Sequence, residues 1–184
     1  MELGAAAGQR SHVVLHYTGH RVLGASGADE RAERRVAEAI GQVLDGLDVA
    51  GACGSLASGA DILFAEALLA RNIPLRVFLP FAAERFAATS VRPAGGAWEA
   101  RFRAILPRLA DVTTLPGAGS DSEAYATCAR AAMAAALAVA RDQGAAPLQL
   151  AVWNGVAARG QAGTAADVRA WAAMGLPSRT IGVG

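Results

Sequence analysis

Short apolar runs alternate along this sequence with longer segments of helical periodicity, and this alternation constrains the fold more than any other feature. The apolar runs predict strands at residues 12–17, 49–54, 73–79, 111–115 and 148–153, with a last strand at 179–183. The segments between them predict helices at residues 30–47, 98–109, 121–141 and 165–174, a helix capped by Ser58, and a short helix plus a loop over 81–96. In the helix at 30–47, one face carries Val36, Ile40, Val43 and Leu44. Pro107 must end or kink the helix at 98–109, and Asp121 is the predicted cap of the long helix that follows. Such alternation favours an α/β fold with a doubly wound, mostly parallel sheet flanked by helices, which is a Rossmann-like arrangement.

The length and composition predict one folded domain. The 184 residues fit a single domain, 1–184, with its core over about 12–184, and no repeat or linker divides them. A chain that is 53% hydrophobic and 18% charged is not intrinsically disordered. The net charge of +1 argues against a dedicated nucleic-acid-binding domain, which would carry a basic patch.

The cysteines and the apolar segments favour a cytoplasmic protein. Cys53 and Cys128 give no disulfide framework, and we expect both to be buried, unreactive thiols. The first ten residues lack the apolar core of a signal peptide. The longest apolar stretch, Ala131 to Ala140, is too short to cross a bilayer, so no membrane partner is expected.

A first glycine-rich turn, Thr18-Gly19-His20-Arg21, directly follows the first predicted strand. Ligands of doubly wound sheets bind beyond the carboxyl ends of the strands, where the strand order reverses. Gly19 lets the backbone approach a ligand, Thr18 offers a hydroxyl, and Arg21 offers a forked donor for a phosphate or carboxylate. The alternative is an ordinary turn with a surface arginine.

A second such turn, residues 54–61, follows the second strand and opens a helix. Its small residues leave backbone N–H groups free at a helix N-terminus, which suits an anion. It lacks the lysine of a P-loop, and Asp61 either only complements the helix dipole or bonds to a neighbouring loop. The candidate ligand-binding residues are Gly54, Ser55, Ser58, Gly59 and Asp61.

A third turn follows the fifth strand and leads into the last helix, where Thr164 is the predicted N-cap and a phosphate contact. Trp153 either stacks on a base or fills the core, and Phe81 would border the same base or sugar. The candidate ligand-binding residues here are Trp153, Asn154, Gly155, Gly163, Thr164 and Phe81.

Three histidines recur at every fourth position, at His12, His16 and His20. Helical spacing would place them on one face, but the segment is a predicted strand. Neighbouring members then lie about 13 Å apart, too far for one metal ion. We therefore expect no metal site, a structural role for His12 and His16, and only His20 near the ligand.

In this order, the three turns resemble those of the SLOG superfamily, the Rossmann-like domains named for the DNA-processing protein DprA (SMF) and the Lonely Guy phosphoribohydrolases. The likeness covers about residues 12–176 and is strongest to bacterial sensor-type members, on residues 59–69, 78–81, 86–91 and 98–106. It implies binding or sensing of a nucleotide-derived molecule, NAD-like, ADP-ribose-like or a cyclic nucleotide, in signalling or antiphage defence. It also favours a homodimer and a fused or partner effector domain. We expect no cofactor.

The resemblance leaves an enzymatic alternative open. Lonely Guy enzymes cleave the N-glycosidic bond of nucleoside monophosphates with a P-G-G-x-G-T-x-x-E motif, whose counterpart here is GQAGTAAD at 160–167. Asp167 replaces the catalytic glutamate, and Asp167 or Glu66 would then stabilise the oxocarbenium ion. The lost Pro-Gly-Gly and the shorter carboxylate weaken this alternative. DprA-like binding of single-stranded DNA is a third alternative, disfavoured because aromatic residues make up only 5% of the chain.

Overall fold

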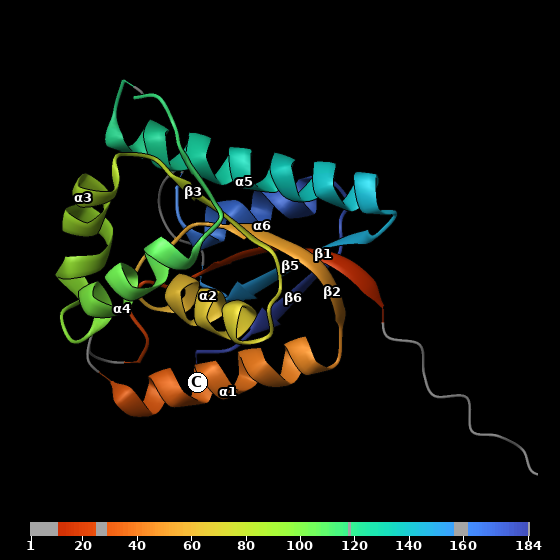
Figure 1. Ribbon diagram of the computed structural model, residues 1–184, viewed down its shortest axis with the longest axis horizontal. Helices are drawn as coiled ribbons and strands as arrows, with labels where there is room; N and C mark the ends of the chain where they lie inside the picture. Colours follow the sequence, from red (N-terminus) through yellow and green to blue (C-terminus); the bar gives the residue numbers. More distant parts are fainter. Residues whose placement is uncertain (1–10, 25–28, 118, 157–161, 184) are drawn as a thin grey trace, which may run out of the picture.

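The computed structural model describes residues 11–24, 29–117, 119–156 and 162–183. Within these ranges, six strands form one sheet in the order β4-β3-β2-β1-β5-β6, and every neighbouring pair is parallel. The strands are β1 (His12–Gly19), β2 (Asp48–Gly54), β3 (Leu75–Leu79), β4 (Asp111–Thr114), β5 (Ala146–Val152) and β6 (Ser178–Ile181). The predicted α/β class is confirmed, and the described sheet is parallel throughout (Figure 1).

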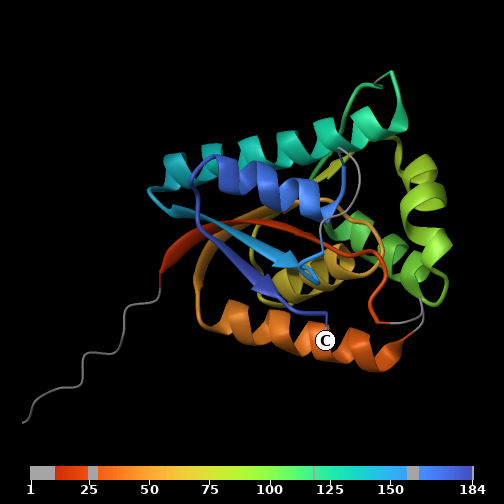
Figure 2. The same ribbon diagram turned by 180° about the vertical axis from the view of Figure 1, so that it is seen from behind.

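Helices cover both faces of the sheet. The α-helices are α1 (Glu30–Asp45), α2 (Ala60–Ala70), α3 (Ala83–Phe86), α4 (Trp98–Ile105), α5 (Asp121–Gln143) and α6 (Thr164–Ala173). Figure 2 shows α5 and α6 on one face and α1 and α2 on the other, with α3 and α4 beyond the ends of the strands. No helix in the described ranges combines the length and apolarity needed to span a bilayer.

The chain order places a topological switch point at β1. From β1 the strands progress outward through β2 and β3 to β4, and α5 then carries the chain back to β5 on the opposite side of β1. Crossovers that leave β1 and β5 towards opposite sides open a crevice at their carboxyl ends.

The two faces of the sheet bury different side chains. On the α1 and α2 side, the predicted stripe of α1 is buried at Val36, Ile40 and Leu44, and α2 is buried nearly all round. On the α5 side, Ala132, Ala136 and Ala140 face the sheet. Small side chains let this long helix approach the sheet closely.

Three helices begin differently from the prediction. Gly59, with φ of 74°, precedes α2 in place of Ser58, and Gly163, with φ of 102°, precedes α6 in place of Thr164. The backbone enters both helices through positive φ, a region that a serine or threonine cap does not adopt without strain. Ser120, rather than Asp121, caps α5 by accepting a hydrogen bond from the Glu123 amide at 3.2 Å.

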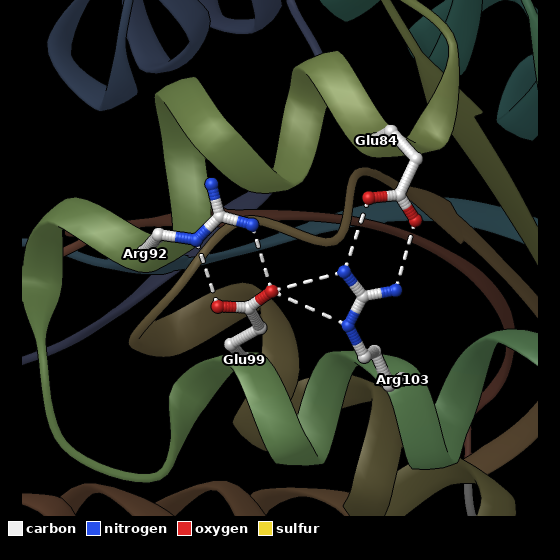
Figure 3. Close-up of polar contacts among 4 residues, drawn as sticks. All are labelled: Glu84, Arg92, Glu99 and Arg103. Atoms are coloured by element: carbon white, nitrogen blue, oxygen red, sulfur yellow. Dashed lines mark hydrogen bonds and ion pairs between the residues drawn. The ribbon is translucent and has the colours of Figure 1, made fainter.

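The segment after β3 is more helical than predicted. Helix α3 continues into a π turn (Ala87–Val91) and a 3₁₀ turn (Arg92–Ala94), and α4 ends at Ile105, before Pro107, as expected. Figure 3 shows how α4 holds this segment: Glu99 accepts from Arg92 and Arg103, and Arg103 also donates to Glu84. These ion pairs join α3 and the 3₁₀ turn, which lie on either side of the π turn, to α4.

The fold makes a testable prediction at Gly59. A Cβ at this residue would lie 2.5 Å from the His20 carbonyl oxygen and 2.7 Å from that of Arg21, in addition to the strain of positive φ. Gly59→Ala should therefore lower the free energy of unfolding by about 3 kcal/mol. Gly144 has a φ of 64°, and a Cβ added there would meet nothing within 4 Å, so Gly144→Ala should cost only about 1 kcal/mol. Equal losses for the two variants in urea unfolding would contradict the close contact.

Candidate functional site

A pocket of about 340 Å³ lies at the switch point, between α5 and α6 and against the carboxyl end of β1. This volume is within the range of small-molecule sites. Nine of the sequence-predicted residues line it, and they come from all three turns and the last helix: Thr18, Gly19, His20, Arg21, Ser55, Asp61, Gly163, Thr164 and Asp167. The structure therefore brings segments far apart in the sequence to one cavity.

Close packing explains why three other predicted residues, Gly54, Ser58 and Gly59, are small or polar. The Ser58 hydroxyl donates to the carbonyl oxygens of Arg21 and Ser90, and the Ala60 amide donates to the His20 carbonyl at 3.0 Å. A Cβ on Gly54 would overlap the Tyr17 ring. Neither Gly54 nor Ser58 nor Gly59 lines the pocket.

The other predicted residues outside the pocket hold the neighbouring segments. Trp153 is half-buried and donates from Nε1 to the Val156 carbonyl at 3.1 Å, so it fills neither the core nor the pocket. The Asn154 amide donates to His20 Nε2 at 3.3 Å, which ties the third turn, including Gly155, to the first. Phe81 is buried edge-on against Tyr125, whose ring does line the pocket.

Glu66, the second catalytic candidate, lies away from the pocket. Both of its carboxylate oxygens accept from Arg101, which also donates to Glu33 and stacks over the Trp98 ring. This ion-pair cluster joins α1, α2 and α4. The second carboxyl in the pocket is Asp61 instead, which the sequence predicts as a ligand-binding residue.

Asp167 and Thr18 connect α6 to β1. The Thr18 hydroxyl donates to Asp167 Oδ2 at 2.7 Å, across 149 positions of sequence. Burial raises the pKa of Asp167 to about 6, although the Thr18 hydrogen bond opposes the shift. A carboxyl with such a pKa exchanges its proton close to neutral pH.

Asp61 is a second buried carboxyl in the same pocket, with 7% of its surface exposed. Burial raises its pKa to about 7. The Ala57 amide, which donates to Oδ2 at 3.2 Å, opposes this shift, as does the charge of Arg21, while the charge of Asp167 adds to it. Two carboxyls that influence each other in a shielded pocket are typical of sites that bind or transfer protons.

Only one of the two helix starts keeps free amides for an anion. At α2 the amides of Ala57, Ser58 and Ala60 already donate within the protein. At α6, Thr164 and Ala165 line the pocket, and within the described residues their amides have no hydrogen-bond acceptor. The predicted anion cradle is therefore retained at α6 and is filled by the chain itself at α2.

Several pocket residues carried no signal in the sequence. Tyr125 of α5 donates to Thr89 Oγ1 at 3.0 Å, and its hydroxyl lies 2.7 Å from Ser90 Oγ. Thr89 and Ser90 lie on the π turn that follows α3, and only the tertiary packing brings them to Tyr125. Cys128, also of α5, lines the pocket as a buried thiol whose pKa is raised by burial to about 12, so it remains protonated.

The histidines separate as strand spacing predicts, with one correction. His12 is exposed and pairs with Asp48 at 2.7 Å, and His20 lies at the pocket. His16, expected to be structural, also lines the pocket. It does so because β1 is buried on both faces, and the face that carries His16 also carries Thr18.

Comparisons with known proteins leave the site to be interpreted from its own geometry. No protein-family model matches the chain, and no curated protein matches it significantly.

The buried Asp61 carboxyl predicts a pH dependence of stability. Its folded-state pKa of about 7 lies above the ordinary 3.8, so the folded protein keeps a proton that the unfolded chain loses. This contribution to stability is complete at low pH, declines from about pH 4 to about pH 7, and then levels off. The side chain of Asp61→Asn cannot ionise, so the variant lacks this loss of stability. Its free energy of unfolding minus that of the wild type should therefore rise by a few kcal/mol between about pH 4 and about pH 7.

Urea unfolding at several pH values measures this difference. Glu38→Gln is the control for loss of a carboxylate, because Glu38 is exposed on α1 and has no ion pair among the described residues. A difference between Asp61→Asn and wild type that stays constant from acid to neutral pH would contradict the raised pKa.

Proposed function

We propose that this chain binds a nucleotide or nucleotide-derived small molecule in the pocket between α5 and α6, as the sensor-type domains of the SLOG superfamily do. The observation that carries the proposal is the convergence of residues from all three glycine-rich turns on one cavity at the switch point. Crevices at this position of doubly wound sheets are the usual ligand sites of the architecture.

The chemistry of the pocket wall supports a ligand with an anionic end. The amides of Thr164 and Ala165, at the positive end of the α6 dipole, have no acceptor among the described residues, and both residues line the pocket together with Arg21. Together they suit a phosphate group. Asp61 and Asp167 are acceptors, and they suit the hydroxyl groups of a ribose or the amino group of a base.

The remaining lining suits a flat apolar group. Phe86, Ala129 and Ala132 contribute apolar surface to the pocket. A nucleotide combines the three parts that this wall accommodates: a phosphate, a hydroxyl-bearing sugar and an aromatic base. The resemblance to the SLOG superfamily favours a specific role for such binding. In that role, the chain binds an NAD-like, ADP-ribose-like or cyclic nucleotide signal in bacterial signalling or antiphage defence.

Isothermal titration calorimetry against AMP, NAD, ADP-ribose and cyclic dinucleotides tests the proposal. Thr164→Pro removes one amide at the first position of α6, where proline is tolerated, and should weaken the phosphate-bearing ligands about tenfold. Thr164→Ala keeps the amide and is the matched control. Adenosine, which lacks the phosphate, should bind both variants alike. A folded wild-type protein that binds none of the nucleotides would contradict the proposal.

A second candidate function, nucleotide N-glycosidase activity, is favoured by the two buried carboxyls with pKa values raised to about 6 and about 7. In the ionised form one carboxyl stabilises an oxocarbenium-like transition state, and in the protonated form the other donates a proton to the leaving base. Water then completes the conversion of AMP to adenine and ribose 5-phosphate.

Chromatographic detection of adenine released from AMP tests this second function. Asp167→Asn and Asp61→Asn should each lower the rate about 100-fold or more. Glu66→Gln makes the same chemical change at a carboxylate that Arg101 holds outside the pocket, and should keep the rate. Equal release by Asp167→Asn and wild type would remove Asp167 from the reaction.

A further inference from the structure

His16 is a buried polar residue in the pocket to which the proposed function assigns no role. It is 2% exposed, lies on β1 two residues before Thr18, and stacks on the Trp171 ring with centroids 5.3 Å apart. Side chains two residues apart on a strand share a face, so His16 and the Thr18–Asp167 pair are presented to the same side of the sheet.

Gln149 of β5 fixes which ring nitrogen of His16 carries the proton. Its amide nitrogen lies 3.2 Å from His16 Nδ1 and 3.4 Å from the Asp167 carbonyl oxygen, and its amide oxygen accepts from the Ser178 hydroxyl at 3.1 Å. A backbone carbonyl can only accept, so the –NH₂ group must face Asp167 and His16. His16 Nδ1 is therefore the acceptor, and the proton resides on Nε2.

The protonated nitrogen is the part of the ring that is open to the pocket. Nε2 has no partner among the described residues, yet no fully buried side-chain nitrogen or oxygen in these ranges lacks a hydrogen bond. The small exposed fraction of His16 therefore includes Nε2, and His16 lines the pocket. Burial also lowers the pKa of the ring to about 3, which keeps the imidazole neutral.

We infer that His16 is a neutral, fixed hydrogen-bond donor in the pocket, positioned by Gln149, and that it selects a ligand whose base presents an unprotonated ring nitrogen. This inference rests on the proposed nucleotide site. The base would place its acceptor at His16 Nε2, while Asp167 and Asp61 accept from donors on the same ligand. A ligand with an ammonium or amino group facing His16 Nε2 would be disfavoured, because two hydrogen-bond donors would then face each other.

The tautomer can be tested without any ligand. Long-range ¹H–¹⁵N NMR spectra of the wild type should show His16 protonated at Nε2 only, unchanged between about pH 5 and about pH 8. Gln149→Glu replaces the donor beside Nδ1 with an acceptor of the same shape, and should move a proton onto Nδ1. A wild-type ring that is protonated at Nδ1, or that titrates in this range, would overturn the inference.

Matched analogues test the contact with the base. AMP and its 1-deaza, 3-deaza and 7-deaza analogues differ by one ring nitrogen each. One of the analogues should bind the wild type about tenfold more weakly than AMP, whereas His16→Phe should bind AMP and that analogue equally. Equal affinity of the wild type for AMP and all three analogues would overturn the base contact. If the Nε2 proton is observed and no nucleotide binds, the proposed function fails while the donor assignment stands.

Discussion

The close contact between the end of β1 and the start of α2 is the constraint on which the rest of the site depends. The Ala60 amide bonds to the His20 carbonyl at 3.0 Å, and the backbone passes so near Gly59 that a side chain there would strike it. This contact occupies the Ala60 amide, one of the amides that an anion would need at α2. It also fixes His20 and Arg21 at the pocket, so the first turn serves the site by its packing as much as by its side chains.

The opposite wall depends on contacts across the switch point. Asp167 is held by Thr18, and Gln149 bonds to both His16 and the first turn of α6. These bonds join β1, β5 and α6 beneath one cavity and leave polar groups shielded from water. Shielding explains why two carboxyls there hold protons near neutral pH while an imidazole beside them stays uncharged.

Much of the fold could be predicted from the sequence because strand and helix periodicities are local. The apolar runs located the strands, the spacing of Val36, Ile40 and Leu44 located the buried stripe of α1, and Pro107 marked the end of α4. The helix starts were less predictable, because a positive φ at Gly59 or Gly163 depends on how the preceding turn packs.

For the candidate site, the sequence by itself determined which turns reach the carboxyl edge of the sheet, since strand order along the chain sets that edge. Only the tertiary structure decided which of their residues face the cavity. Asp61 lines the cavity, whereas Glu66 is paired with Arg101 outside it. His16 and Tyr125 line the cavity as well. The physical reason is that a pocket is made by side chains from distant segments, whose distances and burial no local pattern contains.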